Sequence, residues 1–67
     1  MSNMLLANGY KYNSKIKRYE KIKENKEMYI SMYSKYVQIT KIINKNDIKL
    51  INTINIDRND IKRYLEF

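Results

Sequence analysis

The clearest hydrophobic period of the chain lies in residues 28–43, Met-Tyr-Ile-Ser-Met-Tyr-Ser-Lys-Tyr-Val-Gln-Ile-Thr-Lys-Ile-Ile, and the prediction of the fold starts from it. Apolar and aromatic residues recur there at spacings of three, four, three and four, at Tyr29, Met32, Tyr36, Ile39 and Ile43. This spacing makes two heptad repeats and predicts a helix with one apolar stripe that faces the core.

The same stretch also allows a β-hairpin. Residues 36–43 are rich in β-branched and aromatic side chains, which favour strands. Residues 44–47, Asn-Lys-Asn-Asp, would then turn the chain, and residues 48–56 would return along it. Because periodicity does not separate helix from strand in short apolar runs, a hairpin at about 36–56 stays open as the alternative.

Residues 14–27, which precede this stretch, favour a helix. Ser14 is a suitable N-cap, because its hydroxyl can accept a hydrogen bond from a free amide of the first turn. Ile16, Tyr19 and Ile22 recur every three residues, which is closer to a helical than to a strand period.

The C-terminal third contains one internal echo. Residues 43–49 and 56–62 share the order Ile, Asn or Asp, basic, Asn, Asp, Ile, Lys. This order fits a helix start used twice, in which Asn44 and Asp57 are the N-caps and the second acidic residue meets the positive end of the helix dipole. The helices predicted from it are residues 45–54 and 58–66.

Two short helices with a tight connection resemble a helix-turn-helix arrangement, in which the last helix reads DNA. Arg, Asn and Lys are the side chains that contact base edges in the major groove. The last predicted helix carries them on the side away from Ile61 and Leu65, at Arg58, Asn59, Lys62 and Arg63. We therefore expect a small all-α bundle of three to four short helices with a helix-turn-helix-like C-terminal half. The alternative is an α+β domain with a hairpin at about 36–56 and a C-terminal helix.

The length of 67 residues allows one small domain, residues 1–67. We expect residues 1–13 to be a partly ordered tail that ends in a turn at Asn8-Gly9. The absence of Cys and His excludes disulfides, a Cys/His zinc site and His-based or Cys-based catalysis. The seven carboxylates are scattered and the one Gly excludes a phosphate-binding loop. The sequence therefore predicts no enzyme activity, no metal site and no cofactor.

The charge points to a polyanionic partner. Fourteen basic and seven acidic residues give a net charge of +7, which attracts polyanions. The alternative is that an AT-rich genome, whose codons favour Ile, Lys, Asn and Tyr, produces the charge without a functional role. Half of the basic residues lie within residues 11–26. The candidate nucleic-acid-binding residues are Lys15, Lys17, Arg18, Lys21, Lys23, Arg58, Asn59, Lys62 and Arg63.

A second candidate surface is aromatic and sulfur-rich. Tyr and Met are enriched in the cores of protein interfaces. The candidate partner or self-association face consists of Tyr29, Met32, Tyr33 and Tyr36.

These observations favour a small basic accessory or regulatory protein that binds nucleic acid, DNA rather than RNA, and works as a dimer. The alternative is an inhibitor of the phage or plasmid type, such as an anti-CRISPR or anti-restriction protein, that contacts a host nucleic-acid-handling complex directly. No apolar run approaches the ~18 residues of a membrane span, and the N-terminus lacks the pattern of a signal peptide. We therefore expect a cytoplasmic protein without a membrane partner.

Overall fold

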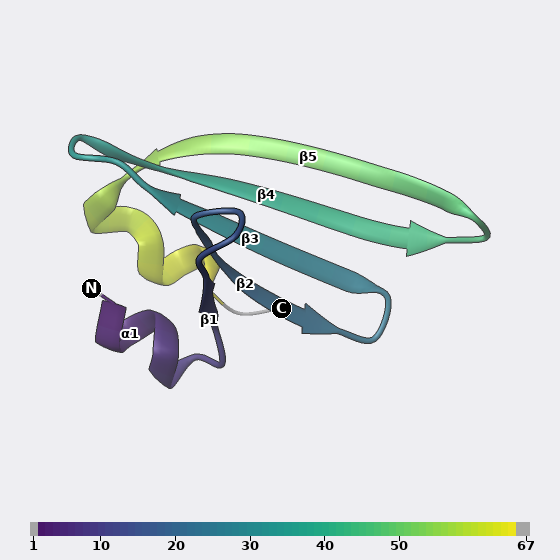
Figure 1. Ribbon diagram of the computed structural model, residues 1–67. Helices are drawn as coiled ribbons and strands as arrows, with labels where there is room; N and C mark the ends of the chain where they lie inside the picture. Colours follow the sequence, from purple (N-terminus) through teal and green to yellow (C-terminus); the bar gives the residue numbers. More distant parts are fainter. Residues whose placement is uncertain (1, 66–67) are drawn as a thin grey trace.

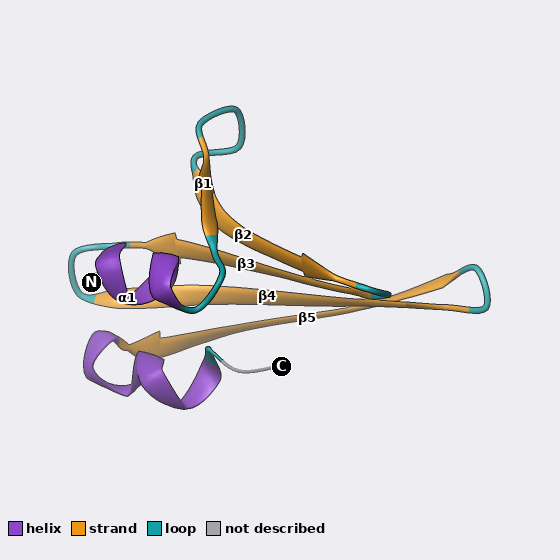
Figure 2. Cartoon of the chain, turned by 90° about the horizontal axis from the view of Figure 1, so that it is seen from below, coloured by secondary structure: helices purple, strands orange, loops and turns teal. Residues whose placement is uncertain are grey.

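The computed structural model describes residues 2–65 as one twisted antiparallel sheet with two short helices on it. The five strands follow one another in the sheet in the order of the sequence. The elements are α1 (Ser2–Ala7), β1 (Lys11–Asn13), β2 (Arg18–Lys23), β3 (Lys26–Met32), β4 (Tyr36–Lys45), β5 (Ile48–Asp57) and the 3-10 helix η1 (Arg58–Tyr64). Both helices lie at one end of the sheet (Figure 1), and the twist turns β1 steeply away from β4 (Figure 2).

Short turns set the register of the meander. Asn46 and Asp47 connect β4 to β5 and have φ angles of 51° and 64°. Positive φ at both central residues is the type I′ turn that matches the twist of a hairpin, and Asn and Asp tolerate it well. Between β1 and β2, Lys17 has a φ of 55°, and the Asn13 side chain accepts a hydrogen bond from the Lys15 amide at 3.0 Å.

Residues opposite each other on neighbouring strands lie on the same side of the sheet, and the register therefore defines two faces. We call the side that α1 and η1 cover the helix face, and the other side the open face. The row Tyr19, Ile30, Ile39 and Ile54 lies on the helix face. The buried core on this face consists of Leu5, Tyr10, Met28, Ile30, Val37, Ile39, Ile61 and Leu65.

The helices cover only part of the helix face. The last residue pair between β3 and β4 is Lys26–Ile43. From this pair onward the β4–β5 hairpin projects as a two-stranded arm, residues 43–50 (Figures 1 and 2), and Asn25 of the β2–β3 turn hydrogen-bonds to Asn44 at its base. On this arm Ile48 and Leu50 belong to the helix face but are 60% and 56% exposed. The core therefore occupies one end of the sheet, and the arm extends away from it.

The expectation of an all-α bundle with a helix-turn-helix-like half is wrong, because the chain is mostly β-sheet. The heptad spacing in residues 28–43 is not a helical stripe. A loop at residues 33–35 interrupts it, so that Tyr29 and Tyr36 point to the open face while Met32, Ile39 and Ile43 point to the helix face. The β-branched and aromatic residues favour a strand more strongly than the heptad spacing favours a helix, because these side chains pack well on a pleated surface.

The helix predicted over residues 14–27 is also wrong. Its apolar positions separate, since Ile16 lies in the β1–β2 loop and Tyr19 packs against the core. Ile22 points to the open face and is 61% exposed.

The internal echo folds in two different ways. Asn44 lies in β4 instead of capping a helix, and residues 45–54 are turn and strand. The N-cap at Asp57 is confirmed, because its side chain accepts a hydrogen bond from the Asn59 amide at 2.9 Å. Asn and Asp serve turns and caps equally well, and the strand that precedes each copy decides which of the two forms.

Two further expectations have clear outcomes. The β-hairpin, the alternative expectation for residues 36–56, is present as β4 and β5. The turn at Asn8-Gly9 is also present, and Gly9 has a φ of 88°. The described part of residues 1–13 forms α1 and β1, and it buries Leu5 and Tyr10 in the core.

Candidate polyanion-binding face

The charges of the sheet are divided unequally between its two faces. Among the strand residues that the structure describes, the helix face carries five lysines and no Asp or Glu. We call these lysines the basic patch: Lys21, Lys23, Lys26, Lys41 and Lys45. The strand residues of the open face carry three basic and three acidic side chains and are balanced: Lys11, Arg18, Lys49, Glu20, Glu27 and Asp57.

The lysines of the basic patch are close enough to reinforce one another. Lys23 lies directly opposite Lys26, an arrangement of like charges that destabilises a sheet. Lys21 and Lys41 flank Met28 in one row, and two strand spacings place their backbones about 10 Å apart. This separation is comparable to the screening length of about 8 Å in physiological salt. The patch therefore produces a positive potential that an anion relieves.

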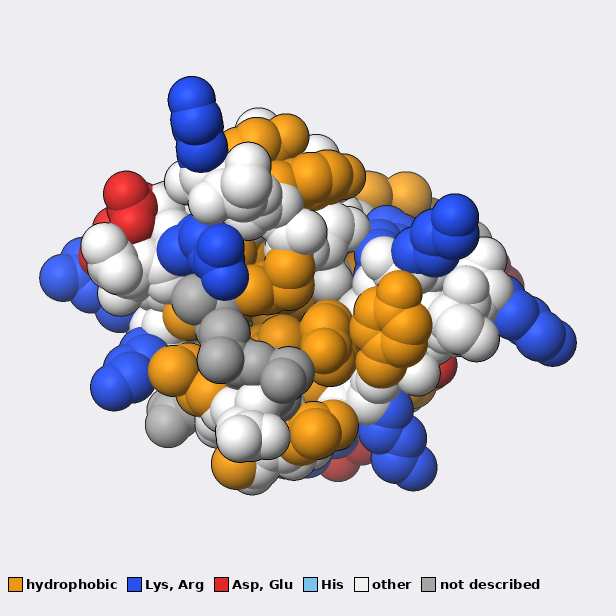
Figure 3. All heavy atoms as spheres, turned by 60° about the vertical axis from the view of Figure 1, so that its left-hand side comes forward, with side chains coloured by type: hydrophobic (Ala, Val, Ile, Leu, Met, Phe, Trp, Pro, Cys, Tyr) orange, Lys and Arg blue, Asp and Glu red, His pale blue; other side chains and the backbone are white. Residues whose placement is uncertain are grey.

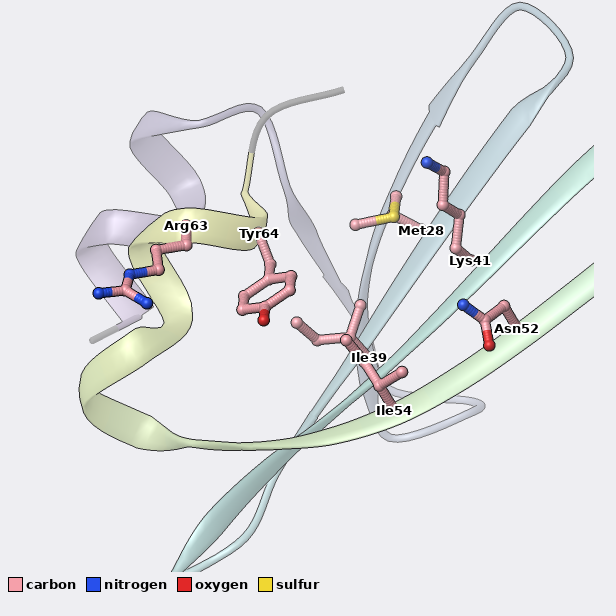
Figure 4. A pocket seen from close by; sticks show the side chains of 7 residues that line it. All are labelled: Met28, Ile39, Lys41, Asn52, Ile54, Arg63 and Tyr64. Atoms are coloured by element: carbon pink, nitrogen blue, oxygen red, sulfur yellow. The ribbon is translucent and has the colours of Figure 1, made fainter.

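A shallow cavity of about 250 Å³ lies where the basic patch meets η1. Ile39 and Ile54 form its floor, and the side chains of Met28 and Tyr64 approach each other above them (Figure 4). The remaining lining residues are Lys41, Asn52 and Arg63. The Arg63 side chain extends away from the strands (Figure 4). The cavity thus combines an apolar floor with an exposed tyrosine ring, an amide and an ammonium group.

Lys21 joins the basic patch to the core. Its Nζ lies 5.5 Å from the centre of the Tyr10 ring, and a cation so placed over an aromatic face is stabilised. Its aliphatic stem passes Gly9, where an added Cβ would come within 3.4 Å of Lys21 Cε. The Tyr10 hydroxyl donates a hydrogen bond to the Leu65 carbonyl at 3.3 Å, and burial raises the pKa of Tyr10 to about 12.

Polar side chains of the open face form hydrogen bonds with one another. Tyr29 donates a hydrogen bond to Glu27 Oε1 at 2.6 Å, and the Asn44 amide donates to Glu27 Oε2 at 2.8 Å. These bonds lower the pKa of Glu27, and the bond to Glu27 raises the pKa of Tyr29 to about 12. The Arg18 guanidinium lies 4.8 Å from the centre of the Tyr29 ring. Arg18 is thus engaged in this network and lies apart from the basic patch.

The other predicted nucleic-acid-binding residues are dispersed. Lys21 and Lys23 belong to the basic patch, whereas Lys15 and Lys17 lie exposed in the β1–β2 loop. On η1, Arg58 donates to the Ser34 carbonyl at 3.4 Å. Asn59, Lys62 and Arg63 are exposed on this helix. Seen from the end where the helices lie, Lys and Arg side chains surround a central hydrophobic area (Figure 3).

Sequence reasoning missed three members of the basic patch, Lys26, Lys41 and Lys45. The signal that identifies them is an alternation of period two. Lys41 and Lys45 continue the inward series of Val37 and Ile39 along β4. A strand interpretation of residues 36–45 places these four on one side.

The predicted Tyr and Met face does not form. Tyr29 and Tyr36 lie on the open face, and Met32 packs against the core on the helix face. Tyr33 lies in the β3–β4 loop, and its ring stacks on that of Tyr36 with 4.8 Å between centroids. The tyrosines therefore contact their own neighbours and form no continuous surface with Met32.

Comparison with known proteins finds no matching family model, curated protein or solved structure. None of the helices within residues 2–65 is long and apolar enough to cross a membrane. In the same residues, no group of three or more acidic side chains gathers as metal ligands would.

Proposed function

We propose that the protein binds nucleic acid, as a small accessory or regulatory protein, and contacts phosphates with the basic patch of the helix face. The observation that carries this proposal is the asymmetry of the sheet. Among the described strand residues, five lysines and no carboxylate occupy one face, and the charges of the opposite face balance. Charge due only to codon bias would fall on both faces alike.

Phosphate contacts by lysine release condensed counterions, and this provides affinity without sequence preference. Asn52 and the exposed Tyr64 ring lie at the margin of the patch, around the cavity beside η1. An amide can hydrogen-bond a base edge and an aromatic ring can stack on an unpaired base. These two residues are the proposed source of any preference among nucleic acids.

The shape of the arm favours duplex DNA over RNA. The major groove of B-DNA is about 12 Å wide and admits a two-stranded β-ribbon, whereas the major groove of A-form RNA is too narrow for side chains to read. Beyond the pair Lys26–Ile43 the arm is such a ribbon, and it carries Lys45 on the helix face. Its type I′ turn keeps the tip compact.

The proposal is tested by measuring affinity for a labelled random duplex and for a labelled single strand across a salt series. The key variant is the double substitution Lys23→Gln and Lys45→Gln, which removes two exposed charges of the basic patch. The matched control is Lys11→Gln and Lys35→Gln, which removes the same charge from the open face and the β3–β4 loop. Each lost phosphate contact lowers the slope of log K against log salt by about 0.9.

We expect the Lys23 and Lys45 variant to lower this slope by about 2 and the control to leave it nearly unchanged. Equal losses in both variants would refute the basic patch as the site. Failure of the wild-type chain to bind either strand at low salt would refute nucleic-acid binding altogether. An acidic protein surface would then be the partner that these charges fit.

A further inference from the structure

Strand β5 forms one edge of the sheet and is ten residues long. No described strand pairs with its outer side. In a hairpin with a two-residue turn, the flanking pair Lys45–Ile48 exchanges both main-chain hydrogen bonds, and such pairs then alternate along the strands. The even-numbered residues of β5 therefore bond to β4. The odd-numbered residues from Lys49 to Asp57 direct their amides and carbonyls outward.

This edge lacks the usual protection against pairing. Natural edge strands are short, or carry prolines, bulges or several charges. Strand β5 contains no Pro and pairs with β4 in an unbroken register. It also exposes large apolar side chains on both faces: Ile48 and Leu50 on the helix face, and Ile51, 64% exposed, on the open face.

The charge of β5 favours a second copy of the chain as the partner that pairs with this edge. Strand β5 carries one basic and one acidic residue, Lys49 and Asp57, and is neutral in a chain of net charge +7. The edge strand itself therefore adds no excess of like charge where two copies meet. In the antiparallel register that places Thr53 opposite itself, Lys49 of each copy lies opposite Asp57 of the other.

This register satisfies the geometry of the edge as well as its charges. It pairs odd-numbered residues with odd-numbered residues, so that five pairs exchange up to about ten main-chain hydrogen bonds. An interface of standard size has about that number. It also places Leu50 opposite Ile56 of the other copy, next to the start of that copy's η1. This contact would cover Leu50, an exposed apolar side chain of the arm.

The size of the surface is also appropriate. A standard interface takes about 800 Å² from each partner, which is about a sixth of the 5066 Å² surface of the chain. The ten residues of the β5 edge and the exposed side chains of Ile48, Leu50 and Ile51 are available to form it. We propose that the protein forms a symmetric homodimer by antiparallel pairing of β5 with β5 of a second copy, centred on Thr53. The dimer is a continuous ten-stranded sheet with both helix faces on the same side.

The first test is the mass in solution, measured by light scattering over a series of protein concentrations. We expect about twice the chain mass of 8.2 kDa, and a dissociation constant at least tenfold higher for Lys49→Glu, which faces Asp57 of the other copy. The control Lys35→Glu makes the same charge change in the β3–β4 loop and should leave the constant unchanged. A monomeric mass at millimolar protein, or equal effects of the two substitutions, would overturn the proposal.

The second test reads the register by cross-linking, which the absence of Cys makes clean. Thr53→Cys places two thiols opposite each other, within the separation of up to about 7 Å that a disulfide spans. Asn55→Cys is the matched control on the same exposed edge and face. Its two copies are offset by four residues, about 13 Å. Rapid disulfide formation by the Thr53→Cys variant alone supports the register, and equal rates for the two variants would overturn it.

Discussion

Replacement of one buried and one exposed isoleucine tests where the core of this small sheet lies. Ile30 is completely buried between Tyr19 and Ile39 on the helix face, whereas Ile22 is 61% exposed on the open face. Truncation of a fully buried isoleucine to alanine costs about 2–5 kcal/mol, because apolar contacts are lost and a cavity remains. For Ile22→Ala, less than half of the side chain is buried, and we expect a cost below about 1 kcal/mol.

These values are large relative to the total stability. At roughly 0.05–0.15 kcal/mol per residue, the free energy of unfolding of a chain this size is about 3–10 kcal/mol. In urea unfolding followed by circular dichroism, a slope near 1 kcal/mol per molar urea gives a midpoint shift of about 3 M for Ile30→Ala and under 1 M for Ile22→Ala. A helix over residues 14–27 would instead bury Ile22. Equal losses, or a larger loss at Ile22, would therefore refute the β-sheet core described here.

Other predictions concern single contacts. Because burial raises the pKa of Tyr10 from 10.0 to about 12, the stability contributed by the neutral Tyr10 side chain, about 3 kcal/mol, persists below pH 10 and is lost as the pH rises from 10 to 12. Unfolding measured at both pH values should show this loss diminished in Tyr10→Phe. Asp47→Ala places a residue that disfavours positive φ in the β4–β5 turn and should lower stability by about 1 kcal/mol in thermal melts; an unchanged or raised stability would contradict the type I′ turn. Asp57→Ala removes the N-cap of η1 and should cost about 1 kcal/mol in urea unfolding, whereas Asp57→Asn should cost less. Tyr29→Phe removes the main cause of the lowered pKa of Glu27, so an NMR titration should show that pKa rise; an unchanged value would exclude the bond.

The hairpin β4–β5 could be predicted from residue type, and the strands before it could not. Val37, Ile39 and Thr40 favour strands, and Asn46-Asp47 is a recognisable turn. In residues 14–32, however, the turns fall at Lys17 and Glu24, whose side chains give no turn signal although both have a φ of 55°. Without these two boundaries, Tyr19 and Ile22 appear as one helical stripe, whereas the fold places them on opposite faces.

The candidate site was predictable in its chemistry and not in its location. The excess of basic residues indicates a polyanion from composition alone. Their grouping depends on strand alternation, which separates Lys21 and Lys23 from Arg18 within one strand and joins them to Lys41 on another. Pairing between strands distant in sequence depends on the tertiary structure, and it cannot be predicted from the local periodicity of the sequence.

An NMR titration of the ¹⁵N-labelled protein with a short DNA duplex at low salt tests the basic patch most directly. We expect the amide shifts to concentrate at Lys23, Lys26, Lys41 and Lys45 and around the cavity beside η1. The amide signals of those β4 and β5 residues whose side chains lie on the open face, such as Thr40, should shift least. Shifts spread evenly over both faces, or concentrated on the open face, would contradict the basic patch as the binding site.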